Sequence, residues 1–143
     1  MKIMLDLNVL LDVAQGREPF YAASAGVLSM LLRGEATACI PGHALTTLHY
    51  LLSRGSSKET ADEFIDWLLA RFKIIGEDHG VFARARSLKM ADFEDAVVAS
   101  AAEAAGCQWI VTRNPKDFLV SPVAPLTPEE FLAEWPNGKV EGI

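Results

Sequence analysis

The chain has 143 residues, half of them hydrophobic, and a formal net charge of −6 at pH 7. Because roughly 100–150 residues is the commonest domain size, we expect a single domain over residues 1–143. The acidic balance argues against tight non-specific nucleic-acid binding through a broad basic surface. It does not exclude a nuclease, since a carboxylate cluster that holds a divalent metal is acidic until it is loaded.

No segment of the sequence predicts membrane insertion or export. No apolar stretch approaches the ~20 residues that span a bilayer, and Asp6 interrupts the first apolar run, which does not resemble a signal peptide. Cys39 and Cys107 each have apolar neighbours, which favours buried reduced thiols over a disulfide or a metal pair. We therefore expect a soluble, cytoplasmic protein with no membrane association.

Short apolar runs alternate with amphipathic segments along the chain. Strands are predicted at residues 3–5, 36–40, 74–75, 108–112 and 122–126. Helices are predicted at residues 9–14, 20–33, 43–53, 58–72, 78–89 and 92–105, and from 128 until the chain frays at Asn137. This alternation implies a mostly parallel sheet covered on both faces, and so a compact three-layer α/β/α domain.

Several residues mark the ends of these elements. Pro41-Gly42 indicates a turn after the second strand, and Pro115 predicts a loop over residues 113–118. Helix-end signals are Ser57 as an N-cap, Gly106 as a stop, and Thr127 with Glu130 as a capping box.

Two oxygen-bearing side chains, Asp6 and Asn8, follow the first predicted strand. They point to the same side if the chain stays extended, and open α/β sheets bind ligands at the carboxyl ends of their strands. The alternative is that they cap the next helix. We expect one of them to do so, and we favour Asp6 as the centre of an acidic metal-binding site.

Asp92 and Asp95 are three residues apart and share the first turn of a predicted helix. They could contribute to a metal site, or they could form a structure like a capping box that also benefits from the helix dipole. Local sequence does not separate these alternatives. Glu94 points off this face, so we expect it to be solvated, although it could reach a second metal.

A second strand ends at Thr112 and is followed by Arg113, Asn114 and Asp117. Asx residues beside proline are ordinary turn formers, but here they follow a strand parallel to the first. Mg²⁺ and Mn²⁺ prefer oxygen ligands, so Asp6, Asp95 and one residue of this loop would make a suitable site.

The remaining candidates are histidines and one arginine. His43 and His49 are six apart on a predicted helix and do not share a face, so we do not expect them to bind a metal together. His49 could approach the acidic site from that helix. Arg113 adjoins the site and is the best candidate for a phosphate contact.

The ordered set of motifs resembles the PIN-domain family from Met1 to about Phe131. These motifs are strand-Asp6-x-Asn8, then Asp92-x-x-Asp95-Ala96, then Val111-Thr-Arg-Asn114-x-x-Asp117-Phe118. The resemblance implies an Mg²⁺- or Mn²⁺-dependent endoribonuclease that hydrolyses RNA with metal-activated water. Small members look like VapC toxins, which implies an antitoxin partner. The resemblance and the apolar faces of residues 20–33 and 43–72 also favour a homodimer.

The resemblance assigns roles residue by residue. The expected catalytic residues are Asp6, Asp92, Asp95 and Asn114, and the expected metal ligands are Asp6, Asp92, Asp95 and Asp117. The expected supporting or substrate-binding residues are Asn8, Thr47, Thr112 and Arg113.

Two positions depart from the family pattern. The family usually has a glutamate early in the helix after the second strand, but residues 44–50 contain no acid, and Thr47 is nearest to the expected place. The last acid, usually directly after Thr-Arg, is Asn114 here, with Asp117 next. The alternative function is therefore a degenerate PIN-fold module that binds RNA or a protein without cutting. A doubly wound nucleotide-binding domain is less favoured because no Gly-rich loop follows the first strand.

Overall fold

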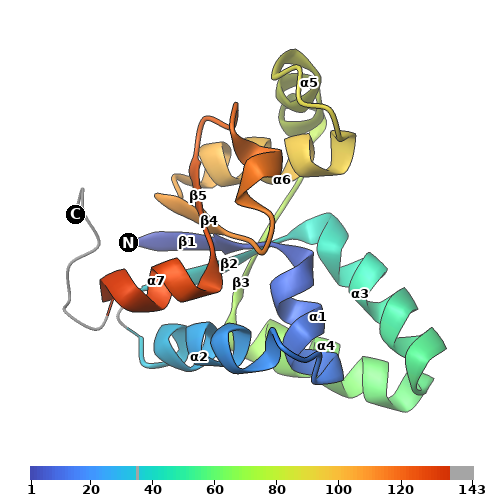
Figure 1. Cartoon of the computed structure of the whole chain (residues 1–143). Coiled ribbons are helices and arrows are strands. Elements are labelled where there is room, and N and C mark those ends of the chain that lie inside the picture. Colours follow the sequence, from blue (N-terminus) through green and yellow to red (C-terminus); the bar gives the residue numbers. More distant parts are fainter. Residues whose placement is uncertain (35, 136–143) are drawn as a thin grey trace.

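The computed structural model describes residues 1–34 and 36–135, whose arrangement Figure 1 shows. The strands are β1 (Lys2–Leu5), β2 (Thr37–Pro41), β3 (Lys73–Ile75), β4 (Trp109–Val111) and β5 (Ala124–Leu126). The helices are α1 (Leu7–Gln15), α2 (Tyr21–Leu32), α3 (Gly42–Gly55), α4 (Lys58–Arg71), α5 (His79–Ser87), α6 (Phe93–Ala105) and α7 (Pro128–Glu134), with a 3-10 turn η1 (Pro115–Phe118). The fraying expected from Asn137 falls outside the described residues.

The strands form a parallel sheet in the order β3-β2-β1-β4-β5. Strand β1 is central, and its Met4 is level with Cys39 of β2 and Ile110 of β4. All carboxyl ends therefore lie at one edge of the sheet, and the end of β1 adjoins the end of β4. This confirms the predicted parallel sheet.

Side chains of β1 alternate between two cores, as expected for a strand covered on both faces. Ile3 and Leu5 pack with residues of α1, α2, α3, α4 and α7, whereas Met4 packs with residues of α5 and α6. Figure 1 shows α5 and α6 on one side of the sheet and α1, α2 and α4 on the other. The predicted three-layer α/β/α architecture is confirmed.

The predicted helix-end residues are confirmed. The Ser57 hydroxyl accepts the N–H of Thr60 at the start of α4, and Thr127 forms a capping box with Glu130 at the start of α7. Gly106 ends α6 with φ of 75°, a left-handed conformation that favours glycine.

Other boundaries differ from the predictions. The prediction of a turn at Pro41-Gly42 is wrong, because Pro41 is the last residue of β2 and α3 begins at Gly42. A Cβ at Gly42 would lie 3.0 Å from the carbonyl oxygen of Ile75, so this glycine permits close approach of β3. The loop over residues 113–118 contains η1, whose first residue is Pro115, where the fixed φ of proline suits a helical turn.

Within the described part of the chain, no helix has both the length and the apolar character to cross a membrane. Cys39 and Cys107 are buried and free, and both belong to the core beneath α5 and α6. The prediction of reduced, buried thiols is confirmed.

Candidate functional site

Asp6 lies at the carboxyl end of β1 and is 7% exposed. It is the N-cap of α1: its Oδ1 accepts the backbone N–H of Leu7 at 2.9 Å, and its Oδ2 accepts the hydroxyl of Thr112 at 2.8 Å. Burial raises the pKa of Asp6 above its ordinary value, although these hydrogen bonds act in the opposite direction. The prediction that Asp6 and Asn8 point to the same side of an extended chain is wrong, because α1 begins at Leu7.

The end of β4 is tied to Asp6 through Thr112, which is buried. The backbone N–H of Asp6 donates to the Val111 carbonyl at 3.0 Å, and the Thr112 hydroxyl that bonds Asp6 also accepts the N–H of Asn114 at 3.1 Å. Asp117 follows on η1, where its N–H donates to the Asn114 carbonyl at 3.0 Å. The two strand ends that the sequence indicated therefore do meet.

The start of α6 brings the second pair of acids. Asp92 is the N-cap, and its Oδ1 accepts the N–H of Asp95 at 2.9 Å. Burial and the negative charges of Asp6, Asp92, Asp117 and Glu94 raise the pKa of Asp95 to about 7. The carboxylates come from three separate segments of the chain, and their charges act on Asp95.

Glu94 lies in the first turn of α6, next to Asp95 in the chain. It is exposed, as predicted. Burial is the main cause of the raised pKa values of Asp6 and Asp95, and the charge of Glu94 contributes to both.

The charge and the donor atoms of the cluster fit a hard divalent cation. Carboxylate oxygens are the preferred ligands of Mg²⁺ and Mn²⁺, and a cation among them would relieve the repulsion that, after burial, raises the pKa of Asp95. Within residues 1–34 and 36–135, however, no three His, Cys, Asp or Glu side chains lie close enough to hold an ion as they stand. Binding would therefore require the carboxylates to move closer together.

A cleft of about 430 Å³ opens beside the carboxylates of α6. The loop before α6 and the segment from η1 onward form its walls, and its lining residues are Lys89, Met90, Ala91, Asp92, Asp95, Lys116, Asp117, Leu119 and Val120. Lys89 has φ of 56°, a strained conformation for a residue with a side chain. The cleft thus combines apolar surface and two lysines with the acidic cluster.

The other predicted site residues lie around Asp6 in varied settings. Asn8 is half-buried in the first turn of α1. The Thr47 hydroxyl donates to the carbonyl of His43 at 3.4 Å within α3. Arg113 is held in the structure, with Nε 2.8 Å from Oδ2 of the fully buried Asp12. Its guanidinium also lies 4.0 Å from the centre of the Phe20 ring, so the phosphate contact predicted for Arg113 competes with this packing.

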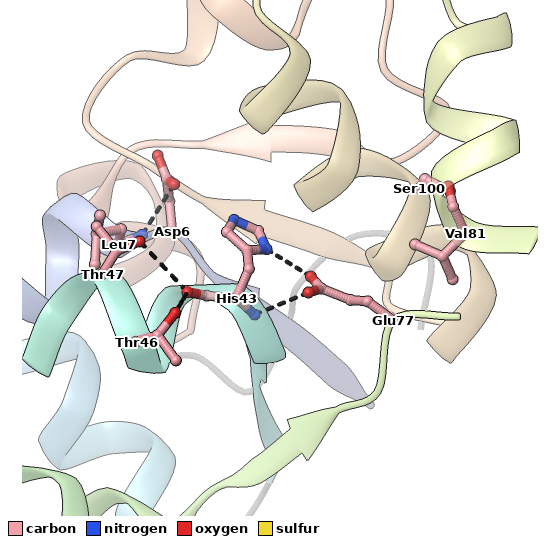
Figure 2. A network of polar contacts seen from close by, with 8 residues as sticks. All are labelled: Asp6, Leu7, His43, Thr46, Thr47, Glu77, Val81 and Ser100. Atoms are coloured by element: carbon pink, nitrogen blue, oxygen red, sulfur yellow. Dashed lines mark hydrogen bonds and ion pairs between the residues drawn. The ribbon is translucent and has the colours of Figure 1, made fainter. Parts of the chain in front are cut away.

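Sequence reasoning missed a pair of residues beside Asp6. His43 and Glu77 are in contact, and Figure 2 shows the His43 imidazole between Glu77 and Asp6. The sequence did contain a signal for Glu77, since it follows the third strand much as Asp6 follows the first. The suggestion that His49 approaches the site is wrong, because its Nε2 lies 2.7 Å from Asp62 of α4.

Comparison with known families identifies the class of protein to which this fold belongs. The model described as PIN domain matches residues 2–116, so the chain belongs to the PIN-domain family. The chain is 26% identical over 139 residues to Ribonuclease VapC1 of Aquifex aeolicus (strain VF5), an alignment that covers 94% of this chain and 95% of that protein.

Solved structures with the same fold include complexes. VapBC2 from Rickettsia felis, bound to a promoter DNA fragment, matches with a TM-score of 0.72 and 24% identity, covering 89% of this chain and 98% of that chain. VapBC-1 from nontypeable Haemophilus influenzae matches with a TM-score of 0.70 and 17% identity, covering 90% of this chain and 99% of that chain. At these identities the likeness establishes the fold.

Proposed function

We propose that the chain is a metal-dependent endoribonuclease that hydrolyses RNA phosphodiester bonds at the acidic cluster around Asp6. The observation that carries this proposal is the convergence of carboxylates on Asp95, whose pKa is raised to about 7 by burial and by its acidic neighbours. A cation bound among these carboxylates would relieve the part of this shift that their repulsion causes. Membership of the PIN-domain family and the resemblance to a named ribonuclease support the same function.

The roles of individual residues in this proposal are metal binding, orientation of a ligand and contact with RNA. Asp6 and Asp95 would hold Mg²⁺ or Mn²⁺, with Asp92, Asn114 and Asp117 completing the site directly or through water. When bound, such a cation lowers the pKa of water and offsets charge on the phosphate. Thr112 fixes the orientation of the Asp6 carboxylate through its 2.8 Å hydrogen bond. Asn8, Thr47 and Arg113 would support this set or contact the RNA.

The cleft beside α6 would hold RNA next to the scissile bond. Lys89 and Lys116 line it and would contact phosphates, while Leu119 and Val120, 79% and 63% exposed, offer apolar surface to bases. Substrate would therefore pass between the lysines and the acidic cluster.

We also infer that this ribonuclease is the cytoplasmic toxin of a toxin–antitoxin pair and forms a homodimer. Support comes from similar structures that are toxin–antitoxin complexes by name, including one from Klebsiella pneumoniae. Exposed apolar side chains such as Leu32 of α2 and Leu69 of α4, 42% and 54% exposed, offer surface for such partners.

The substitution Asp6→Asn tests the catalytic proposal. An asparagine keeps an oxygen for the N–H of Leu7 and can donate to the Thr112 hydroxyl, so the fold should persist while the charge is lost. We expect Mn²⁺-dependent cleavage of single-stranded RNA to fall by at least about 100-fold, with the melting temperature little changed. Asp66→Asn, at an exposed position on α4, is the matched control and should cleave normally. Equal cleavage by wild type and Asp6→Asn would exclude Asp6 from the reaction.

A second candidate is a PIN-fold module that binds RNA or a protein without cutting. Asn114 in place of an acid, and the absence of an acid on the first turns of α3, favour this candidate. Calorimetric titration with Mn²⁺ separates the two functions. Binding that Asp6→Asn weakens supports the nuclease, whereas no binding at millimolar Mn²⁺ leaves the binding module.

A further inference from the structure

Glu77 and His43 form a tightly held pair where β3 ends and α3 begins. Glu77 accepts the backbone N–H of His43 through Oε1 at 2.8 Å, and its Oε2 lies 2.6 Å from Nδ1 of the same residue. The Glu77 and His43 side chains are 7% and 23% exposed. With one carboxylate bound to both the backbone and the ring, the imidazole has little freedom to rotate.

This pair depends on the close approach of β3 to α3. The N-cap residue of α3 is Pro41, which offers no side-chain cap, so Glu77 supplies the missing acceptor from another element. Gly42 makes room, because a Cβ there would lie 3.0 Å from the Ile75 carbonyl oxygen and 3.7 Å from Oε1 of Glu77. The chain thus places a carboxylate at α3 even though α3 carries none of its own.

The free side of the imidazole faces Asp6 (Figure 2). Figure 2 shows Glu77 on one side of the ring and Asp6 on the other, with the second ring nitrogen, Nε2, on the side of Asp6. A positive charge on His43 would lower the pKa of Asp6, against the larger opposing effect of burial. Nδ1 lies 2.6 Å from the Glu77 carboxylate, so when both ring nitrogens carry protons, Nδ1–H donates to Glu77 and Nε2–H is left for a ligand on the side of Asp6.

We propose that His43 contacts the substrate phosphate, its Nε2–H donating to a non-bridging oxygen of the phosphodiester held at Asp6, and that Glu77 is the positioning residue for this contact. The inference rests on the proposed ribonuclease function. A phosphate that enters a group of carboxylates needs a donor to offset its charge, and His43 faces the cluster from the side of α3. Where the PIN-domain resemblance implies an acid early in α3, this chain therefore presents an imidazole.

Kinetics of RNA cleavage in Mn²⁺ test the contact. His43→Gln should lower kcat/KM by about tenfold to a hundredfold, as expected for a lost charged hydrogen bond. Glu77→Gln should act in the same direction, because an amide can still accept the N–H of His43 but no longer forms an ion pair with the protonated ring. His49→Gln is the matched control, since His49 lies on the same helix and also contacts a carboxylate, at 2.7 Å. It should cleave like the wild type.

A sulfur substitution in the substrate distinguishes contact from folding. If His43 donates to one non-bridging oxygen, replacing that oxygen with sulfur should slow the wild type for one phosphorothioate isomer only. His43→Gln should lose this isomer dependence. An unchanged isomer effect in His43→Gln, or unchanged kcat/KM, would overturn the contact while leaving the ribonuclease function intact.

Nuclear magnetic resonance gives a result that does not depend on cleavage. Inorganic phosphate, added to the wild-type chain in Mg²⁺, should shift the Nε2 resonance of His43 and leave that of His49 unchanged. If RNA is not cleaved but this shift occurs, the proposed function fails and the phosphate contact stands. If His43 does not respond, the contact fails.

Discussion

Asp95 is a side chain whose pKa depends strongly on its burial and its neighbours. It carries no positive partner among the described ion pairs, and burial with four nearby carboxylates raises its pKa to about 7. An aspartate in an unfolded chain has a pKa of about 3.9. Between about pH 4 and about pH 7, Asp95 therefore carries a proton in the native protein that it has already released in the unfolded chain.

This difference predicts how Asp95→Asn changes stability without metal. Because the native state binds more protons between about pH 4 and 7, this group favours folding at low pH and loses that contribution as the pH rises. Asparagine does not titrate, so in EDTA the variant should become more stable than the wild type as the pH rises, by a margin that is largest at about pH 8. Thermal unfolding at several pH values measures this. A wild type that remains the more stable chain at pH 8 would contradict the assigned burial and repulsion.

At the scale of elements, the start of α6 combines a structural role with a candidate chemical one. The sequence left open whether Asp92 caps the helix or binds metal, and the structure confirms the cap, which uses Oδ1. The other carboxylate oxygen is not needed for the cap. The two roles are therefore compatible, and substitution can separate them.

Asp92→Ser should preserve the cap and remove the charge. Serine is as good an N-cap as aspartate, so stability should change by only a few tenths of a kcal/mol, whereas Asp92→Ala should cost about 1 kcal/mol. If Asp92 supports the metal, both variants should weaken Mn²⁺ binding to a similar extent in calorimetry. Normal Mn²⁺ affinity in Asp92→Ser would restrict this residue to capping.

At the scale of the whole molecule, the sequence predicted the layers because each depends on local patterns. Runs such as residues 3–5 are short and apolar, as strands covered on both faces are, and the polar residues after them mark one sheet edge. It did not predict the contact between His43 and Glu77, since these residues are 34 apart and meet only because β3 pairs with β2. Pro41-Gly42 was misinterpreted because local sequence cannot distinguish a glycine that turns the chain from one that admits a neighbouring strand.

The net charge of −6 sets an expectation for RNA binding by the whole chain. Of the described residues that line the cleft, the cations are Lys89 and Lys116. With about two or three phosphates neutralised, a plot of log K against log salt for single-stranded RNA should have a slope between about −1.4 and −2. Fluorescence anisotropy with the Asp6→Asn variant measures this slope. Lys116→Ala should reduce it by about 0.7, and a slope steeper than about −4 would indicate a broad basic surface instead.

The central claim is that a divalent cation binds at the carboxyl ends of β1 and β4, between Asp6 and the first turn of α6. Anomalous X-ray scattering from crystals soaked in Mn²⁺ tests it most directly. We predict a peak within coordination distance of both the Asp6 and the Asp95 carboxylates, absent from crystals of Asp6→Asn soaked in the same way. A wild-type crystal with no peak at millimolar Mn²⁺, or with its peak away from these two residues, would contradict the account.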